Sequence, residues 1–504
     1  MASQLVWFKR DLRISDHAPL HEAAKAGPCI CIFVYEPELY LSVEFDPSHL
    51  KFINESLAEL DQALHLRGSR LVIREGSIPE VFDQLREESP FEKIWSHEET
   101  GNYTTYMRDL RVKAWADQYG IDWEEIPQTG VIRGLKDRDG WADRWERRMS
   151  RKIIPTPTRI ILPPDLDEVS RGRILSFEDL GIPQSQKTQA QIGGEKIAHE
   201  TMASFLTSRG LNYRKAMSSP LEGWSSCSRL SPYLAFGNIS VKQAYQTSLA
   251  RKIELLEEQD QSDLQNRKWM QALDSFQGRL RWHCHFMQKL ESEPEIEFEN
   301  MSHIYDGMRE NEFDEAKFFR FRSGQTGYPM IDACMRALRA TGWINFRMRA
   351  MLVSFATYHL WLHWRKPALF LAKHFLDFEP GIHYPQIQMQ AGVTGINTIR
   401  IYSPPKQALD QDPEGAFIRK YVPELAMVPK EYLAEPHKMP PLLQQAFGCV
   451  IGVDYPEPLV DHVTAYRKAK ERIFELRQSQ AAKLEAQSVY KKHGSRRRPA
   501  SERF

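Results

Sequence analysis

Short apolar runs alternate with helical stretches through the first third of the chain, and this alternation limits the fold more than any other feature. Apolar runs that suit buried strands occur at residues 5–8, 29–35, 70–74 and 93–96. Between or after them lie amphipathic stretches at 18–26, 48–66, 78–87 and 103–119. This spacing predicts a parallel sheet with helices on both faces. Such sheets bind ligands beyond the carboxyl ends of their strands, but no GxGxxG motif indicates the usual dinucleotide site.

The composition changes twice after this region. A long stretch rich in Pro, Gly, Gln and Ser is typical of a linker. From about residue 196 the pattern is helical and rich in Trp, Phe, Met and Arg, and one last long helix is predicted at 460–487. We therefore expect an α/β plus all-α protein, with an α/β domain at 1–130, an interdomain linker at 131–195, a helical domain at 196–475, and a helix end with a basic, disordered tail at 476–504.

Charge and cysteine content exclude several classes of protein. Lys plus Arg and Asp plus Glu both total 67, so no overall field attracts nucleic acid. The six cysteines are widely spread and form no CxxC pair, which argues against a disulfide scaffold or a zinc ribbon. The most apolar stretch, 351–364, is too short to span a bilayer, and the first residues lack the order of a signal peptide. We expect a soluble, intracellular (cytoplasmic) protein without a membrane partner.

Four phrases then narrow the assignment to one family. They are LVWFKRDLRISDH at 5–17, CSRLSPYLAFGNIS at 227–240, SGQTGYPMIDACMRALRATGW at 323–343 and DPEGAFIRKYVPEL at 412–425. Together and in this order they resemble the photolyase/cryptochrome family of FAD-binding blue-light flavoproteins, over about residues 4 to 475. The resemblance implies an N-terminal α/β domain, a long linker and a C-terminal helical domain that binds FAD.

The second phrase suits the phosphates of FAD. A pyrophosphate needs main-chain N–H groups, hydroxyls and a fixed cation, and residues 226–231 supply these ahead of a helical pattern. Taken alone, the motif is better explained as a helix cap of serines. The resemblance implies that the phosphates and ribityl chain are held by Tyr213, Cys227, Ser228, Arg229, Leu230 and Ser231. Cys227 stands where a Thr is usual, so one hydrogen bond is expected to be weaker.

The isoalloxazine ring needs a nearby cation and acceptors at its edge. The matching positions are Arg349 and Asp377, with Glu379 in place of a customary Asp; a structural ion pair between helices is the alternative for the first two. By the same resemblance His383 falls where an Asn or Asp faces flavin N5, and it would give a proton to the reduced ring, or else only fill space beside Tyr384. Further residues expected around the ring and the cavity over it are Phe276, Arg279, Trp282, His283 and Phe346.

Several residues that carry DNA repair in this family are replaced. Arg279 stands at the position of a Glu that grips the dimer, Ala350 at that of a Met, and Phe346 at that of an Asn; Trp282 is retained. For the (6-4) photoproduct, the two expected His positions read Asn345 and Ala350. The repair of either lesion therefore loses support, although a pocket that accepts DNA is still expected.

The usual chain of three Trp residues for light-driven flavin reduction is also interrupted. Trp364 matches the middle member, the flavin-proximal position reads Ile387, and the surface position falls in MRENEFDEAK, which has no Trp. Another route could use Tyr358, Trp361, Tyr384 or Tyr402, and the sequence does not choose among them.

Three further sites were considered. A second, light-harvesting chromophore such as a folate or a deazaflavin would bind near Glu98, Glu99 and Asn102, although no pattern identifies it. The adjacent residues His283, Cys284 and His285 point in different directions on a helix, so no metal site is expected. The basic end of the chain, with six Lys or Arg against Glu502 in 488–504, could assist contact with DNA.

Three functions remain open at this point. The first is a cryptochrome-like photoreceptor that changes the flavin redox state in light and signals to a protein partner. The second is a DNA photolyase that repairs UV lesions by electron transfer from reduced FAD. The third is a flavin- or nucleotide-binding interaction protein that does not respond to light.

Overall fold

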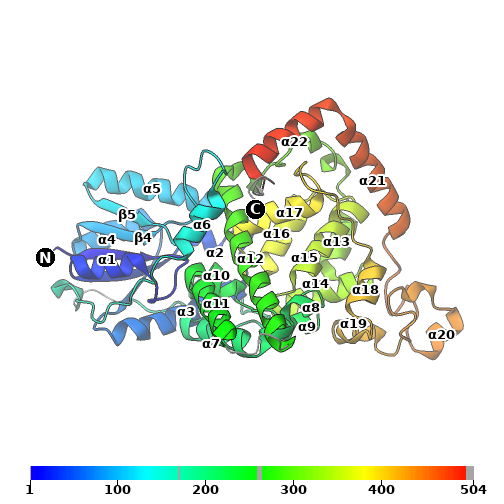
Figure 1. Cartoon of the computed structure of the whole chain (residues 1–504), viewed down its shortest axis with the longest axis horizontal. Coiled ribbons are helices and arrows are strands. Elements are labelled where there is room, and N and C mark those ends of the chain that lie inside the picture. Colours follow the sequence, from blue (N-terminus) through cyan, green and yellow to red (C-terminus); the bar gives the residue numbers. More distant parts are fainter. Residues whose placement is uncertain (1, 168–170, 258–263, 495–504) are drawn as a thin grey trace.

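Five short strands at the start of the chain form one parallel sheet in the order β3-β2-β1-β4-β5. The computed structural model describes residues 2–167, 171–257 and 264–494 (Figure 1). The strands are β1 (Gln4–Phe8), β2 (Cys29–Tyr35), β3 (Leu71–Glu75), β4 (Lys93–His97) and β5 (Asp122–Ile126). Because the chain runs from β1 outward to β3 and then returns to place β4 beside β1, the order reverses between β1 and β4. This reversal is where open α/β sheets place their ligands.

Side chains of the strands alternate between two apolar cores, as the pleat requires. Leu5 and Trp7 face the core covered by α4 (Ile78–Glu88) and α5 (Tyr103–Tyr119). Val6 and Phe8 face the core covered by α1 (Ala18–Ala26) and α3 (Pro47–His65). Helices on both faces confirm the predicted α/β layer.

Four of the five strands were predicted, and β5 was missed. Its sequence, DWEEI, carries three acids and gives no apolar run, and its side chains are exposed or half-buried, whereas the opposite edge strand β3 begins with three buried apolar residues. An edge strand that is partly open to solvent does not need a continuous apolar sequence. The segment expected to be a linker also contains a helix, α6 (Trp141–Met149), whose Trp141, Trp145 and Met149 are buried in the helical domain's core.

The rest of the chain is helical, as predicted. The long helix α12 (Leu264–Ser292) runs through the middle of the molecule in Figure 1, with other helices of this domain on either side of it. The other α-helices of the helical domain are α7 (Glu195–Thr207), α8 (Tyr213–Ala216), α9 (Glu222–Ser226), α10 (Ser231–Ala235), α11 (Val241–Glu257), α13 (Glu315–Ser323), α14 (Pro329–Thr341), α15 (Phe346–Ser354), α16 (Arg365–His374), α17 (Pro380–Ala391), α18 (Pro404–Gln411), α19 (Ala416–Tyr421), α20 (Pro441–Ala446), α21 (His462–Gln478) and α22 (Gln480–His493).

The last long helix predicted at 460–487 is instead two helices. The backbone of Ser479 is extended, with ψ 149°, and its hydroxyl accepts a hydrogen bond from Ala482 N at 3.1 Å. Ser479 therefore ends α21 and caps α22. The basic tail expected after this helix continues into residues 495–504, which lie outside the described part of the chain.

The loop after β1 fixes the two domains to each other. Arg10 donates from Nε to Ala235 O at 2.8 Å and from Nη2 to Phe378 O at 2.7 Å. Arg13 Nη1 donates to Gly237 O at 2.8 Å. Gly237 has φ +71°, and a Cβ there would lie 2.2 Å from Arg10 O. Only glycine permits this approach of the two backbones.

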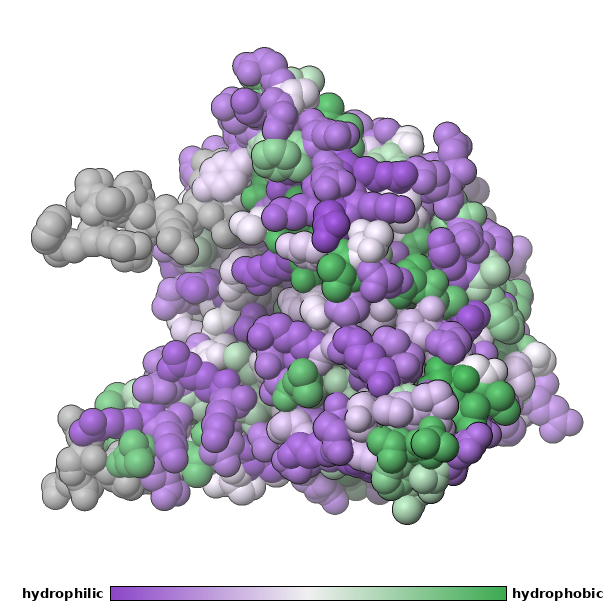
Figure 2. Space-filling view, turned by 90° about the vertical axis from the view of Figure 1, so that its right-hand side faces the viewer, coloured by the Kyte–Doolittle hydropathy of each residue, from purple (hydrophilic) through white to green (hydrophobic). Residues whose placement is uncertain are grey.

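No helix in the described ranges is long and apolar enough to cross a membrane. Figure 2 shows one face of the molecule, on which hydrophilic residues predominate and apolar side chains form small groups. Such a mixture is ordinary for a protein surface in contact with water.

Candidate functional site

The turn expected to hold phosphates runs from Cys227 to Leu230, between α9 and α10. Arg229 has φ +61°, in the left-handed region that a side chain seldom adopts. Its guanidinium lies between two indole faces, 3.7 Å from the ring centre of Trp224 and 3.9 Å from that of Trp343. Nε and Nη2 both donate to Gln191 Oε1, at 3.1 and 2.9 Å. The strained backbone and the stacked side chain together hold this cation in one position.

One nitrogen of that guanidinium remains for a ligand. Arg229 Nη1 is buried and has no hydrogen-bond partner among the described residues. Burial lowers the pKa of Arg229 to about 9, since the protein around it replaces water without supplying a direct carboxylate partner. Burial also raises the pKa of the Cys227 thiol to about 11, so this residue is a neutral, weak hydrogen-bonding group.

Arg349 of α15 and Asp377 form an ion pair at the expected ring end of the site. Arg349 donates from Nη1 and Nη2 to the two carboxylate oxygens of Asp377, at 3.0 and 2.8 Å. A third bond, from Nε to Ile344 O at 2.9 Å, fixes the plane of the guanidinium. Both charges also act on the pKa of Arg229, so the turn and the ion pair lie in one region of the helical domain.

Glu379 supplies an unpaired acceptor beside this ion pair. Its side chain is buried, Oε2 lies 3.5 Å from Arg10 Nη2, and Oε1 has no partner within the part of the chain that the structure describes. Burial raises the pKa of this carboxyl. An orphaned carboxylate oxygen inside a protein is costly unless a ligand or water meets it.

His383 of α17 is buried among aromatic rings, and its ring centre lies 5.3 Å from that of Phe378 and 5.4 Å from that of Tyr384. Its Nε2 lies 2.9 Å from Ala368 O, which can only accept, so Nε2 carries the proton. Burial lowers the pKa of His383 to about 4. At neutral pH the remaining nitrogen, Nδ1, is therefore a lone-pair acceptor and holds no proton to give.

The residues expected over the ring form a partly exposed patch on α12 and α15. Tyr213 is buried and hydrogen-bonds with Arg279. Its ring packs edge-on against Phe205, whose ring centre lies 5.0 Å from that of Phe276. Trp282 is 43% exposed and Phe346 48% exposed, so both offer aromatic surface to a partner. The half-buried His283 has its pKa lowered to about 4 by desolvation, so it is neutral at pH 7.

Asn345 and Ala350 stand at the two positions where the resemblance would place His residues for the (6-4) photoproduct. Asn345 caps α15 by accepting from Met348 N at 3.3 Å, and its amide donates to Met217 O and Ser219 O, both at 3.0 Å. Ala350 is buried. The polar groups of Asn345 are thus used within the chain, and the methyl group of Ala350 offers no hydrogen bond.

Trp364 is fully buried, and its indole N–H donates to Asn300 Oδ1 at 2.8 Å. Ile387 lies on α17 with 5% of its surface exposed. Trp364 and Ile387, which stand at two of the expected positions of the Trp chain, are therefore both buried in the same apolar core.

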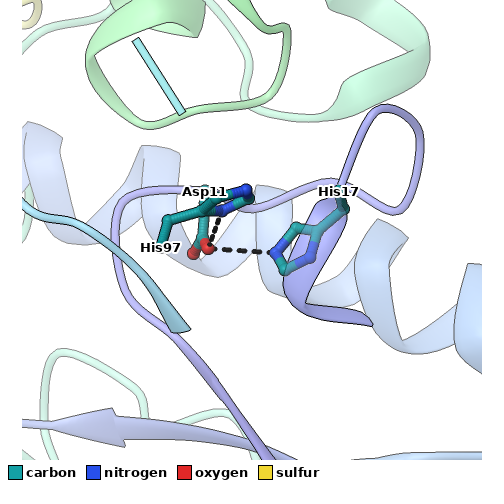
Figure 3. A group of neighbouring side chains, drawn as sticks. All are labelled: Asp11, His17 and His97. Carbon is teal, nitrogen blue, oxygen red and sulfur yellow. Dashed lines mark hydrogen bonds and ion pairs between the residues drawn. The ribbon is translucent and has the colours of Figure 1, made fainter. Parts of the chain in front are cut away.

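Sequence reasoning missed a buried cluster of Asp11, His17 and His97 at the reversal between β1 and β4 (Figure 3). Asp11 Oδ2 lies 3.0 Å from His17 Nε2 and 2.7 Å from His97 Nδ1, and Oδ1 accepts from Lys9 N at 2.7 Å. Burial alone would raise the pKa of Asp11, but the two imidazoles hold it well below its usual range. The signal was present as polar residues directly after two apolar strands.

This cluster has the ligand types of a metal site, but its hydrogen bonds argue against one. His17 Nδ1 accepts from Leu20 N at 3.1 Å, so the ring proton sits on Nε2, the nitrogen that faces Asp11. A metal would have to displace that proton and leave an imidazolate. The arrangement is that of a carboxylate satisfied by two N–H donors, which joins β1, α1 and β4.

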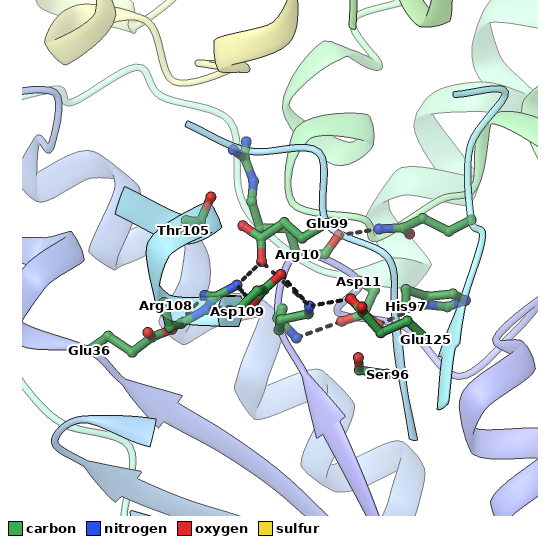
Figure 4. A network of polar contacts seen from close by, with 12 residues as sticks. Arg10, Asp11, Glu36, Ser96, His97, Glu99, Thr105, Arg108, Asp109 and Glu125 are labelled. Atoms are coloured by element: carbon green, nitrogen blue, oxygen red, sulfur yellow. Dashed lines mark hydrogen bonds and ion pairs between the residues drawn. The ribbon is translucent and has the colours of Figure 1, made fainter. Parts of the chain in front are cut away.

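A second network fills the carboxyl edge of the sheet, where the antenna chromophore was expected (Figure 4). Arg108 of α5 binds Glu36 at 2.9 Å, Glu99 at 2.5 Å and Asp109 at 2.8 Å. Lys9 Nζ lies 3.6 Å from Asp109, within 4.0 Å of Glu99 and Glu125, and makes no hydrogen bond to any described residue.

The three residues named for the antenna take part in, or lie beside, this network. Glu99 is held by Arg108, Asn102 caps α5 by accepting from Thr105 N at 3.3 Å, and burial raises the pKa of Glu98. Burial also raises the pKa of Glu36 to about 7. The edge is thus polar and partly buried, and most of its charged groups are paired within the chain, whereas Lys9 Nζ has ion-pair neighbours but no hydrogen bond.

A parallel α/β domain joined to a helical domain with a fixed cation, an ion pair and an orphaned acceptor defines a protein that binds a nucleotide cofactor. Comparison with known proteins identifies the family. Residues 4–133 match the family described as DNA photolyase, and residues 276–475 match the FAD binding domain of DNA photolyase. The chain belongs to the photolyase/cryptochrome family, and FAD is the cofactor of its helical domain.

Cryptochromes and photolyases are similar to this chain to a comparable degree. A cryptochrome DASH of Gloeobacter violaceus is 27% identical over 91% of this chain and 93% of its own length. Cryptochrome-2 of Arabidopsis thaliana is 28% identical over 94% of this chain and 79% of its own. A bacterial class III photolyase from Agrobacterium tumefaciens has the same fold, with a TM-score of 0.81 at 23% identity, over 95% of this chain and 98% of that one.

The residues present fit FAD. The unpartnered Nη1 of Arg229 suits an anionic phosphate, and the unpartnered Oε1 of Glu379 suits an N–H donor at the edge of a flavin ring. In addition, Arg349 supplies a positive charge whose guanidinium plane is fixed by Asp377 and by Ile344 O. These are buried groups that gain a partner when the cofactor binds.

Proposed function

We propose that this protein is a blue-light photoreceptor of the cryptochrome kind, in which light changes the redox state of bound FAD. The observation that carries the proposal is Arg279, a cation on α12 beside Tyr213 where photolyases that repair cyclobutane dimers have a carboxylate. A guanidinium cannot accept the N–H donors of base edges, so the pocket loses its grip on the lesion.

In this proposal the bound FAD supplies absorption of blue light and one-electron chemistry. Arg229 and the serines of its turn hold the phosphates, and Arg349 places positive charge beside the ring. Asp377 keeps Arg349 in plane, which fixes the orientation of that charge. His383, neutral at pH 7, and the aromatic residues around it exclude water from the ring face. A signalling protein partner would read the resulting change at the surface.

The first test is the absorption spectrum of the purified protein before and after blue light. A yellow protein that bleaches reversibly supports the proposal, and a protein that stays colourless after incubation with FAD contradicts it. A spectrum unchanged by light would favour a flavin-binding interaction protein instead.

The second test separates a photoreceptor from a repair enzyme. We expect the reduced protein to leave a defined cyclobutane dimer in duplex DNA unrepaired under blue light. Arg279→Glu restores the carboxylate and is the matched variant for a gain of repair. Repair by the unaltered protein at a rate comparable with a known photolyase would contradict the photoreceptor proposal.

A DNA photolyase is the second candidate, and an exposed basic and aromatic surface favours it. Trp282 is half-exposed beside Arg279 and Arg281. A cavity of about 520 Å³ is lined by Arg347, Ile399, Arg400, Ile401, Tyr402, Tyr466, Lys470 and Phe474, with three cations and no carboxylate. Cations with interleaved aromatic rings suit a nucleic-acid strand, and the basic tail could extend that contact.

A further inference from the structure

Tyr384 and Glu44 form a buried hydrogen bond that crosses from one domain to the other. Tyr384 OH donates to Glu44 Oε1 at 2.8 Å, over a sequence separation of 340 residues. The phenol is fully buried and Glu44 is 8% exposed. A tyrosine of the helical domain therefore has a carboxylate proton acceptor supplied by the α/β domain, at a distance that suits proton transfer.

Tyr384 also lies at the ring end of the FAD site. It follows His383 on α17, and its ring centre is 5.4 Å from that of His383. The ring centre of Phe378, the residue next to Asp377, is 6.2 Å away. Tyr384 thus packs directly against the residues that surround the Arg349–Asp377 pair.

The other aromatic residues considered for electron transfer lack a proton acceptor. Tyr358 OH is buried with no partner among the described residues, and the guanidinium of Arg309 lies 5.4 Å from the ring centre of Tyr358. Tyr402 is only partly buried, and Ser354 binds its backbone N–H rather than its phenol. Oxidation of a phenol without a base leaves a buried cation, which is costly.

The two indoles are also poorly placed. Trp361 lies between two guanidinium groups, with Arg309 at 4.7 Å and Arg472 at 4.8 Å from its ring centre, so a positive charge on its ring would be repelled. Trp364 donates its N–H to the amide oxygen of Asn300, which is not a base. Tyr384 alone of these five side chains donates to a carboxylate among the residues that the structure describes.

We propose that Tyr384 is the proton-coupled electron donor to photoexcited FAD in this protein, with Glu44 as the acceptor of its phenolic proton. The inference rests on the proposed light-driven redox change. One electron leaves Tyr384 for the excited isoalloxazine ring, the phenolic O–H bond breaks, and the proton moves to Glu44. Tyrosine is oxidised to a neutral radical, the cofactor is reduced by one electron, and Glu44 becomes a neutral acid.

The step leaves no buried cation on the protein side, because the positive charge departs with the proton. When charge recombination returns the electron to the tyrosyl radical, Glu44 gives back the proton and the hydrogen bond is restored. The missing indole at Ile387 is thus replaced by a donor of different chemistry on the same helix.

The test is electron paramagnetic resonance on full-length, FAD-loaded protein that contains ring-deuterated tyrosine, frozen during blue illumination. We expect a tyrosyl signal that narrows on deuteration, that is lost in Tyr384→Phe, and that is unchanged in the matched variant Tyr358→Phe. Glu44→Gln, which keeps the shape but removes the base, should slow photoreduction about a hundredfold. FAD occupancy and thermal melting verify that each variant is folded.

The outcomes separate the two proposals. Wild-type protein that binds FAD but never photoreduces would overturn the photoreceptor proposal and this one with it. Wild-type protein that photoreduces without a tyrosyl signal, or with an equal signal in Tyr384→Phe, would overturn only the donor assignment. Unchanged photoreduction in Glu44→Gln would overturn the role of the carboxylate. Loss of the signal in Trp364→Phe as well would mean that the electron enters through the indole first, which contradicts Tyr384 as the donor.

Discussion

The guanidinium of Arg229 is held in place by groups of the protein itself, two indole faces and Gln191, so that it need not be ordered when a phosphate arrives. Preorganisation of this kind improves affinity because less side-chain entropy is lost on binding. At the scale of single residues, the site is therefore built from charges whose positions are set before the cofactor binds.

We expect Arg229→Ala to weaken FAD binding by about 1.5–3 kcal/mol, the range of one charged hydrogen bond, which is roughly 10- to 100-fold in Kd. Titration of cofactor-free protein with FAD, followed by flavin fluorescence, measures this. Arg229→Lys keeps the charge but cannot stack as a plane, so its affinity for FAD should lie between those of the wild type and of Arg229→Ala. An equal loss in the exposed control Arg173→Ala would show that the effect is not local.

The pH at which His383 can donate a proton is set by its burial. Its pKa is lowered to about 4, so the ring is neutral at pH 7 and becomes a donor only as the pH falls towards 4. If His383 protonates the photoreduced cofactor, the fraction of reduced cofactor that is protonated should increase as the pH falls from 6 to 4 in wild-type protein. No such increase is expected in His383→Leu. Absorption spectra after illumination measure it. A midpoint near 6.5, or the same curve in both proteins, would contradict the role.

At the scale of elements, the Asp11 cluster joins β1, α1 and β4 through one carboxylate. Removing one partner of a buried charged group costs more than the interaction is worth, because the other groups stay buried. We expect Asp11→Asn to lower the free energy of unfolding by about 3–5 kcal/mol at pH 7. Urea unfolding followed by circular dichroism measures it, and the exposed Asp143→Asn is the control.

The same cluster makes the domain sensitive to mild acid. Burial lowers the pKa of His97 to about 3, whereas an unfolded His titrates near 6.5. Between these values the unfolded chain binds a proton that the folded chain does not, so stability falls as the pH falls. One such group contributes about 1.4 kcal/mol per pH unit. His97→Gln should flatten the slope of unfolding free energy between pH 6 and 4 by up to this amount; an unchanged slope would contradict it.

The elements themselves were largely predictable, and the exceptions have physical reasons. Strands β1, β2 and the start of β3 are apolar because their side chains enter the cores on both faces of the sheet, and an apolar run is what sequence shows best. Strand β5 was missed because it is an edge strand with acidic side chains. The break at Ser479 depends on one hydroxyl capping one helix, which the periodicity of the surrounding residues conceals.

The site was predictable only in part, for a similar reason. The Arg349–Asp377 pair followed from matched motifs, and the structure confirms that the two residues meet. The stacking of Arg229 between Trp224 and Trp343, and the bond from Tyr384 to Glu44, join residues from 5 to 340 positions apart that no local pattern connects. Contacts of this kind are decided by packing, and sequence spacing carries no signal for them.

At the scale of the whole molecule, Arg10 connects the two domains and the cofactor site. It donates to carbonyls of the helical domain at two places, and Glu379 Oε2 lies 3.5 Å from its Nη2 as a buried counter-charge. We expect Arg10→Ala to lower the free energy of unfolding by about 2–3 kcal/mol, since two charged hydrogen bonds are lost and Glu379 remains buried. It should also raise the pKa of Glu379 further and weaken FAD binding.

Differential scanning calorimetry with and without FAD measures both effects of this variant. The mild variant Arg10→Lys keeps the charge near Glu379 but cannot reach both carbonyls, so it should recover part of the stability. If Arg10→Ala melts at the wild-type temperature in both conditions, the loop after β1 does not hold the domains together.

The loop after β1 also has a consequence for how the protein is made. Arg10 is synthesised before its partners, which lie 225 and 368 positions later in the chain. At 5–20 residues per second, the second partner is synthesised roughly 20 to 70 seconds afterwards. For that interval the newly made α/β domain presents an unsatisfied arginine and the bare edge of its sheet to the cell. Until the helical domain is made, chaperones and proteases can therefore reach the surface of the α/β domain that later packs against the FAD-binding domain.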